Sequence, residues 1–269
     1  MSTNSPKLFS FKKTIKYFTI FLFICVLYGH FIERNWIEVT HHKLKAPLKK
    51  TLKIMHLTDL HIDEFGVREE KVLSIMDIEK PDLILISGDS IQNTKSYVGL
   101  KELLLKLKAP LGVWSVRGNW ENRIKNSNEI KLYQETGAQL LINENRQLID
   151  NVWLIGLDIG NRKPGIKDAQ RGVPSNTFKI GLFHAPAFFE KNYKNFDLVL
   201  AGHSHGGQIR IPFLIDLVLD LKKGVGVFIE GWFQKENSKM YVSRGVGTST
   251  LPIRFLCRPE VAIIQLEPL

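Results

Sequence analysis

The chain has 269 residues, of which 44% are hydrophobic and 24% are charged, so it can bury a sizeable core and disorder is not the default expectation. This length fits one large domain with an appendage, or two small domains. The net charge of +10 predicts an anionic partner, which leaves nucleic acid, acidic lipid headgroups and a phosphorylated substrate open. Two cysteines, Cys25 and Cys257, exclude a framework of several disulfides.

The N-terminal residues carry a membrane signal. An uncharged apolar run at residues 17–28 follows Lys12, Lys13 and Lys16, and its length lies between that of a signal-peptide core and that of a minimal spanning helix. Because no small-x-small cleavage site follows the run, an uncleaved anchor is favoured over a cleaved signal. Basic residues also follow the run, so the positive-inside rule leaves open which side of the membrane carries the rest of the chain.

Strand-like and helix-like segments alternate after this anchor. Residues 33–50 are polar and basic and predict a linker or a first edge strand. Segments that begin as apolar strands and end in polar residues lie at 52–61, 82–90, 111–119, 152–160, 178–186 and 196–205. Helical spacing is found at 67–81 and 97–110, and a third helix is expected from 119 to 133. The alternation predicts an α/β layered domain over residues 46–269, with an anchor and linker over residues 1–45.

Polar residues cluster just past the expected carboxyl ends of the strands, where open α/β sheets bind their ligands. The candidates are Asp59, His61, Asp89, Asn119, His184, His203 and His205. All offer oxygen or imidazole ligands and none offers a thiolate, which suits Mn, Fe, Zn, Ni or Co at a hydrolytic centre better than a structural zinc. Seven ligands can hold two metals if one carboxylate bridges, and Asp89, from the central apolar strand, is the natural bridge. Each motif alone has an ordinary structural explanation, but the full set in order predicts a site.

These motifs, DLH, GDS, GNWE, FHAP and GHSHGGQ, resemble those of the calcineurin-like metallophosphoesterase superfamily. The resemblance covers roughly residues 50 to 269 and implies a four-layer α/β/β/α sandwich. It implies one metal held by Asp59, His61, Asp89 and His205, and a second held by Asp89, Asn119, His184 and His203. Manganese is the expected metal, and a hydroxide bridging the two ions is the expected nucleophile.

Two longer stretches, GHSHGGQIRIP and YVSRGVGTSTLPIRFLCRPE, resemble a membrane-associated bacterial branch of this superfamily. That branch includes phosphodiesterases and a pyrophosphatase that acts on UDP-2,3-diacylglucosamine in lipid A synthesis. The resemblance therefore implies a membrane-anchored enzyme that hydrolyses a pyrophosphate or phosphodiester bond of a lipid-linked substrate. A broad phosphodiesterase acting on nucleotides or cell-envelope polymers is the alternative, and a non-catalytic metal-binding scaffold is the alternative of another class.

Trp120 departs from the family pattern, which often has a histidine at this position. Indole cannot transfer a proton at neutral pH, so general-acid help is expected to be missing there. Its loss is most tolerable when the leaving group is already good, as in a pyrophosphate. Trp120 is otherwise explained as part of the pocket wall, or as a ring that stacks on a uracil or sugar.

The remaining candidates concern substrate and partners. Four arginines are candidates for anion binding near the site, namely Arg117, Arg244, Arg254 and Arg258, and Arg117 is equally explained by a surface salt bridge. Residues 209–233 carry a helical apolar stripe that predicts either a core helix or a flap for acyl chains. No nucleic acid is expected, because no groove of basic and aromatic residues is identified, and no obligate protein partner is evident. A UDP-sugar substrate places the enzyme in the cytoplasm, whereas a simple N-terminus-in anchor places it outside.

Overall fold

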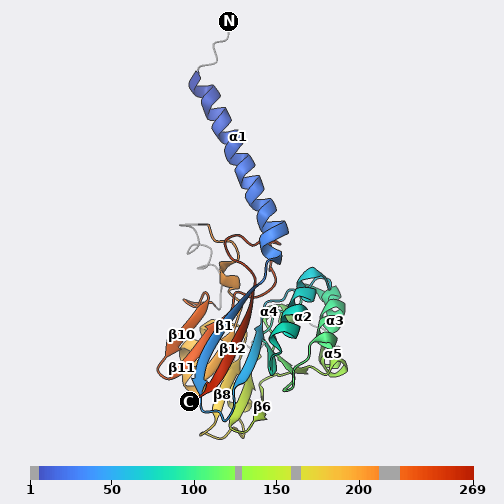
Figure 1. Cartoon of the computed structure of the whole chain (residues 1–269), viewed down its shortest axis with the longest axis vertical. Helices are drawn as coiled ribbons and strands as arrows, with labels where there is room; N and C mark the ends of the chain where they lie inside the picture. The colour runs from blue at the N-terminus through green and yellow to red at the C-terminus, as the bar shows by residue number, and fades with distance from the viewer. Residues whose placement is uncertain (1–5, 125–128, 159–164, 212–224) are drawn as a thin grey trace.

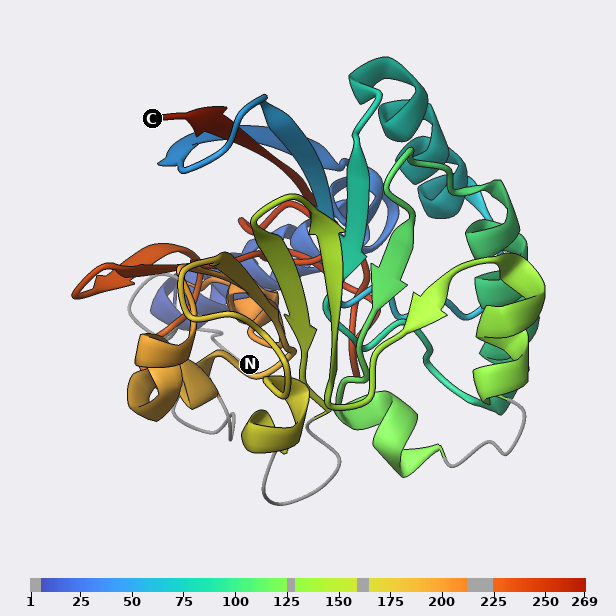
Figure 2. The same ribbon diagram turned by 90° about the horizontal axis from the view of Figure 1, so that it is seen from below.

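A computed structural model describes residues 6–124, 129–158, 165–211 and 225–269. Two six-stranded sheets face each other, and helices cover the outer face of each sheet (Figures 1 and 2). The expected four-layer α/β/β/α sandwich, preceded by an apolar helix, is thereby confirmed.

The first sheet is built from both ends of the described chain. Its order is β1 (Glu38–Ala46), β12 (Glu260–Pro268), β2 (Leu52–Leu57), β3 (Leu83–Ile86), β4 (Val113–Ser115) and β5 (Gln139–Leu140). β12 runs parallel to β1 and antiparallel to β2, and β2 to β5 are parallel. Residues 33–50 thus contain an edge strand, whereas the division of the chain at residues 45 and 46 stays a prediction.

The second sheet has the order β10 (Gly231–Lys235), β11 (Ser238–Val242), β9 (Leu198–Ala201), β8 (Phe178–Leu182), β7 (Val152–Gly156) and β6 (Glu144–Ile149). β11, β9, β8 and β7 are parallel, and an antiparallel strand closes each edge. Both sheets are therefore parallel where their central strands end, so those carboxyl ends can share one site.

Three apolar cores separate the four layers. The first lies between β2–β4 and the helices α2 (Val67–Glu79), α3 (Tyr97–Lys106) and α5 (Glu129–Thr136). The second lies between the two sheets, and the third lies between the second sheet and the short helices α6 (Ile166–Ala169) and α7 (Phe189–Asn192). Central strands are apolar on both faces because each face meets a core.

Short helical turns complete the domain. The helix expected at residues 119–133 consists, within the described residues, of α4 (Asn119–Arg123) and α5. The 3-10 turns are η3 (Thr94–Ser96), η4 (Pro186–Phe188), η5 (Tyr193–Asn195) and η6 (His205–Gly207). The apolar stripe expected at residues 213–221 lies outside the described residues.

The N-terminal helix projects away from the sandwich (Figure 1). α1 (Pro6–Leu27) continues through a π-helical turn, η1 (Tyr28–Ile32), and a 3-10 turn, η2 (Glu33–Asn35), directly before β1. The segment Phe11–Asn35 is long and apolar enough to cross a membrane, and only 6% of its most apolar window is buried in the protein. Signal sequences near an N-terminus share this length and composition.

Candidate metal centre

The predicted ligands leave the carboxyl ends of strands in both sheets. Asp59 and His61 follow β2, Asp89 follows β3 and Asn119 follows β4, whereas His184 follows β8 and the pair His203 and His205 follows β9. Five of the seven lie in the left-handed backbone region, with φ of 49° at Asp59, 41° at His61, 52° at Asp89, 71° at His203 and 54° at His205. Residues with a Cβ seldom adopt this conformation, and such outliers concentrate at functional sites.

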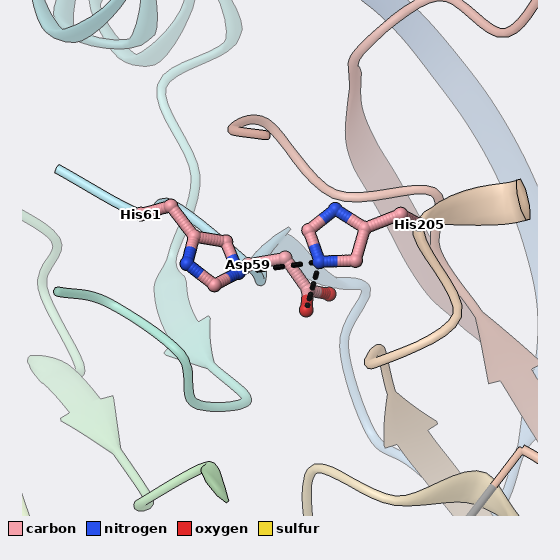
Figure 3. A group of neighbouring side chains, drawn as sticks. All are labelled: Asp59, His61 and His205. Carbon is pink, nitrogen blue, oxygen red and sulfur yellow. Dashed lines mark hydrogen bonds and ion pairs between the residues drawn. The ribbon is translucent and has the colours of Figure 1, made fainter. Parts of the chain in front are cut away.

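One cluster, here called group one, contains Asp59, His61 and His205 (Figure 3). The Nε2 atom of His205 lies 3.2 Å from the Asp59 carboxylate and 3.2 Å from Nε2 of His61. The second oxygen of Asp59 accepts hydrogen bonds from the His203 amide at 2.9 Å and the Thr58 hydroxyl at 3.0 Å. One carboxylate oxygen is thus held by the protein, and the other faces two imidazoles.

A second cluster, group two, contains Asp89, His184 and His203. His184 Nε2 lies 3.1 Å from Asp89 Oδ2, 3.0 Å from His203 Nδ1 and 3.2 Å from the side-chain oxygen of Asn119. Its other nitrogen lies 2.9 Å from the carbonyl oxygen of Ser87, which orients the ring as outer partners orient metal-bound histidines. Asp89 Oδ2 also lies 3.7 Å from His61 Nε2, so Asp89 stands between the two groups.

This donor set fits two divalent cations. Nitrogen and carboxylate oxygen atoms converge from both sheets, and within each group the candidate ligand atoms lie within 4.8 Å of one another. Imidazole nitrogens so close to each other and to a carboxylate present lone pairs that a cation satisfies. All seven predicted residues are brought together, with Asp89 at the position expected of a bridge.

Burial and the neighbouring charges shift the pKa values of the carboxylates and imidazoles in the two groups. Burial raises the pKa of Asp59 and Asp89, but the neighbouring histidines lower it below its usual range. Burial lowers the pKa of His184, yet Asp89 and then Asp59 outweigh this effect and raise it to about 9. For His61 burial prevails over Asp89 and Asp59, and its pKa falls. Both carboxylates therefore carry full charge at neutral pH, the form that binds a divalent cation.

Comparison with known proteins identifies the family. The model for the calcineurin-like phosphoesterase family matches residues 52–207, which is more than half of the chain and includes all seven residues of the site. The chain belongs to this family. It is accordingly a metallophosphoesterase, an enzyme of the hydrolase class.

Relatives of similar size are named as metallophosphoesterases or, in one case, as a phosphodiesterase. The metallophosphoesterase YkuE of Bacillus subtilis is 30% identical over 259 residues, which cover 89% of either chain. A metallophosphoesterase of Aquifex aeolicus is 27% identical over 264 residues, covering 91% of this chain and 98% of the relative. The phosphodiesterase YaeI of Escherichia coli is 28% identical over 262 residues, covering 89% of this chain and 92% of the relative.

Two glycines of this phosphoesterase let its loops approach the ligands. A Cβ on Gly118 would lie 2.1 Å from Asp89 Oδ1, and one on Gly202 would lie 2.0 Å from the Thr58 hydroxyl and 2.4 Å from Asp59 Oδ2. A third glycine, Gly88, acts instead as a turn former, because its φ of 94° is a conformation that glycine adopts readily. At Gly118 and Gly202 the backbone is outside the left-handed region, so what matters is space.

Glu121 joins two loops of the site, a role that the sequence did not reveal. Its buried carboxylate accepts hydrogen bonds from the amides of Gly118 at 2.8 Å, Asp89 at 3.0 Å and Ser90 at 2.5 Å. Burial and then the charge of Asp89 raise the pKa of Glu121 to about 7. Its place in the first turn of α4 was the available signal, because a glutamate three residues after a helix cap commonly reaches back to the backbone.

Trp120 lies beside group one. Its indole packs edge-to-face on His61, with ring centroids 5.3 Å apart, and its amide donates to Asp89 Oδ1 at 2.8 Å. The guanidinium of Arg123 lies 5.7 Å from the same ring. The half-buried indole thus forms part of the wall of the metal centre.

The four candidate arginines are engaged within the protein. Arg117 pairs with Glu129 at 2.5 Å and Asp158 at 3.5 Å. Arg244 pairs with Glu38 at 2.8 Å and Glu260 at 3.4 Å, and Arg258 lies 4.2 Å over the ring of Trp36.

Arg254 is fully buried and donates to carbonyl oxygens of Arg244, Gly245, Gly247 and Cys257, so it holds the loop at residues 244–257 and is placed away from solvent.

The loop at residues 251–258 connects the foot of α1 with group one. Glu33, only 1% exposed, accepts hydrogen bonds from the amides of Leu256 at 3.0 Å and Cys257 at 2.5 Å. The Cys257 thiol in turn lies 3.3 Å from the carbonyl oxygen of His205. The foot of the apolar helix is thereby linked, through Cys257, to the backbone of His205, a candidate ligand.

Proposed function

We propose that this phosphoesterase hydrolyses a pyrophosphate or phosphodiester bond of a lipid-linked substrate. UDP-2,3-diacylglucosamine, yielding UMP and a lipid monosaccharide phosphate, is the best single candidate. The observation that carries the hydrolytic reaction is the pair of ligand groups that meet at Asp89. The apolar segment Phe11–Asn35 is largely unburied and lies near the N-terminus, where an anchor is expected. An enzyme anchored in this way would meet substrates in the membrane, which supports a lipid-linked substrate.

The seven site residues are proposed to hold two divalent ions, with manganese as the first candidate. Asp59, His61 and His205 would hold one ion, His184, His203 and Asn119 the other, and Asp89 would contact both. Two bound ions would lower the pKa of a water molecule and neutralise charge on the phosphoryl group. The chain itself orients the two carboxylates. The Trp120 amide donates a hydrogen bond to Asp89 Oδ1, and the His203 amide donates one to Asp59 Oδ2.

Trp120 is proposed to restrict the leaving group. Its ring packs edge-to-face on His61 beside group one, and an indole N–H cannot transfer its proton at neutral pH. General acid catalysis contributes about 10²–10⁴-fold where the leaving group is poor. A phosphate leaving group needs less protonation, which favours a pyrophosphate over an alkyl diester. Arg117 is proposed only to hold α5 near the site, because its charge is shared between Glu129 and Asp158.

A broad phosphodiesterase is the second candidate. The name of the relative YaeI, a phosphodiesterase, favours it. The contacts of the four candidate arginines favour it too. Each makes an internal contact in place of a contact with a nucleotide phosphate: Arg117, Arg244, Arg254 and Arg258. A non-catalytic scaffold is less favoured, since no ligand of the site is missing.

The test uses the full chain in detergent, loaded with manganese. Hydrolysis of UDP-2,3-diacylglucosamine and of bis-p-nitrophenyl phosphate is measured side by side, with Asp89→Ala as the inactive control. We expect turnover of both, with the pyrophosphate preferred. Turnover of the diester alone supports the broad phosphodiesterase. No metal-dependent turnover of either compound contradicts the proposal.

A protease-accessibility assay on sealed inner-membrane vesicles tests the location. We propose a membrane-anchored enzyme whose sandwich faces the cytoplasm, because a UDP-sugar is a cytoplasmic substrate. Digestion of the sandwich in inverted vesicles, and protection in right-side-out vesicles, is the expected result. The reverse pattern would exclude a UDP-linked substrate.

A further inference from the structure

Five large apolar side chains surround the place where the N-terminal helix joins the sandwich. They are Phe31, Ile32, Trp36, Leu251 and Leu256, here called the collar, and their exposed fractions are 64%, 55%, 52%, 53% and 56%. We propose that the collar docks into the headgroup–acyl boundary of the bilayer that α1 enters. This proposal rests on the anchoring role given to α1 above.

The two halves of the collar are held together although they are more than 200 residues apart in sequence. His30 Nδ1 lies 2.9 Å from the carbonyl oxygen of Pro252, and the Arg34 guanidinium donates to the same oxygen at 3.2 Å. Glu33 accepts from two amides of the loop, and the rings of Tyr28 and Phe255 pack edge-to-face with centroids 6.4 Å apart. A Cβ on Gly29 would lie 2.6 Å from the Arg254 carbonyl oxygen, so the contact is close. These contacts therefore fix the two halves of the collar relative to each other.

A lipid surface is the occupant that the chemistry favours. The collar is continuous with a helix that is apolar and almost wholly unburied, so a protein partner covering it would also have to surround the C-terminal end of that helix. The Arg258 guanidinium lies over the Trp36 ring, 4.2 Å from its centroid, and Arg34 precedes Trp36 by two residues. Tryptophan with neighbouring cations is typical of the membrane–water interface, where the ring meets acyl chains and the cation meets phosphate.

Docking of the collar would place the metal centre near the bilayer. The loop that carries Leu251 and Leu256 also pairs with the segment after His205, because the Arg210 amide donates to the Phe255 carbonyl at 2.8 Å and the Phe255 amide donates to that of Gln208 at 3.0 Å. A phosphate at the membrane surface would then lie close to the ligand loop, whereas a soluble diester needs no such placement. The collar therefore predicts different effects on the two kinds of substrate.

The test compares Leu251→Ser/Leu256→Ser with Ile78→Ser/Val98→Ser, both in the full chain. The control pair changes two exposed side chains, at 74% and 77%, on α2 and α3. The proteins are reconstituted in vesicles of phosphatidylcholine and phosphatidylglycerol. Loss of two inserted leucines is expected to lower hydrolysis of UDP-2,3-diacylglucosamine in the vesicles about tenfold. Hydrolysis of bis-p-nitrophenyl phosphate and all activities of the control pair stay unchanged.

A direct contact measurement separates this proposal from the proposed substrate. Brominated lipids are expected to quench part of the tryptophan fluorescence of the full chain, and Trp36→Phe removes that part. Quenching without turnover of the UDP-lipid supports the collar and contradicts the substrate. Turnover with equal quenching in the full chain and in Trp36→Phe overturns the collar. A concentration-dependent dimer that the leucine variant loses, without lipid quenching, overturns it in favour of a second copy of the chain.

Discussion

The two ligand groups have the same origin and different surroundings. Each combines residues from the carboxyl ends of both sheets, but group one is closed and group two is open on one side. Asp59, His61 and His205 are at most 2% exposed, and Thr58, Trp120 and Gly245 pack around them. In group two, Asp89 and His184 are equally buried, whereas His203 and its neighbour Asn119 are half-buried.

The difference in exposure between the two groups indicates where a substrate can approach the metal centre. A closed group can hold a cation firmly, and an open group can exchange water for a phosphate. We therefore expect the substrate to enter beside His203 and Asn119. Variants of the residues around each group test this division of roles.

The largest effect is expected from Asp89→Asn, because this carboxylate contacts both groups. Losing one negative charge between two cations should lower kcat/KM about 10³-fold or more, and the metal content should fall below two ions per chain. Elemental analysis and a diesterase assay measure the two quantities. Asp150→Asn, at an exposed hairpin, is the matched control and should change neither. Full metal content with full activity in Asp89→Asn would remove Asp89 from the role of a bridge.

Chemical rescue should distinguish the open group from the closed one. His203→Ala and His61→Ala should each lower activity about 10²-fold or more. Free imidazole added to the assay should restore part of the activity of His203→Ala, because that position is half-buried, and none of His61→Ala, which is 2% exposed. Equal rescue of both variants would contradict the division into a closed and an open group.

Glycine substitutions should disturb the two groups separately. An added methyl at Gly202 meets Thr58 and Asp59 of group one, and one at Gly118 meets Asp89 of group two. Overpacking of this kind costs about 1–3 kcal/mol of stability, and displaced ligands should lower activity about tenfold to a hundredfold. Denaturant unfolding and metal titration measure these changes. Gly66→Ala is the control, since the nearest atom there is 3.8 Å away. A Gly202→Ala variant with normal metal affinity would show that the close approach is unimportant.

A buried carboxylate away from both groups should affect stability alone. Glu260 accepts hydrogen bonds from Thr40 at 2.6 Å, from Tyr241 and from the Arg244 amide at 2.9 Å. Since Glu260 and Thr40 lie in the first sheet and Tyr241 lies in the second, these hydrogen bonds connect the two sheets. Burial raises its pKa, but Arg244 and these donors outweigh burial and lower it. A lowered folded-state pKa stabilises the fold above the unfolded value near 4.5 and loses that stability as pH falls below it.

Glu260→Gln should therefore cost about 1–3 kcal/mol at pH 7 and less at pH 3, with the metal content unchanged. Denaturant titration at the two pH values measures the difference. An equal loss at both pH values would show that the charge of Glu260 does not contribute. A loss of metal in this variant would instead extend the closed region around group one.

The smallest effect is expected from Trp120→His. A histidine there can donate a proton, so hydrolysis of an alkyl diester should rise up to about tenfold, short of the full range of general acid catalysis. Hydrolysis of bis-p-nitrophenyl phosphate, with its good leaving group, should stay within about twofold. Trp120→Phe is the matched control without a proton donor. Unchanged or lower activity on the alkyl diester would contradict the leaving-group argument.

The candidate ligands could be predicted because their signals are local. Each follows an apolar strand within a few residues, and parallel strands end at one edge, so pattern and topology together place Asp59, Asp89 and His184 near one another. The partners of the arginines could not be predicted, because they come from distant segments. Arg244 meets Glu38, 206 residues away, and Glu33 holds the amide of Cys257, 224 residues away.

Sequence alone therefore determined the layered fold, the apolar helix and the identity of the seven candidate ligands, since these depend on hydrophobic periodicity and on residue chemistry. Only the tertiary structure decided that Arg254 is a buried support for a loop, that Gly118 and Gly202 provide space, and that one ligand group is closed and the other open. These features depend on which segments come into contact when both sheets pack together. Burial and close approach are properties of that packing and leave no periodic pattern in the chain.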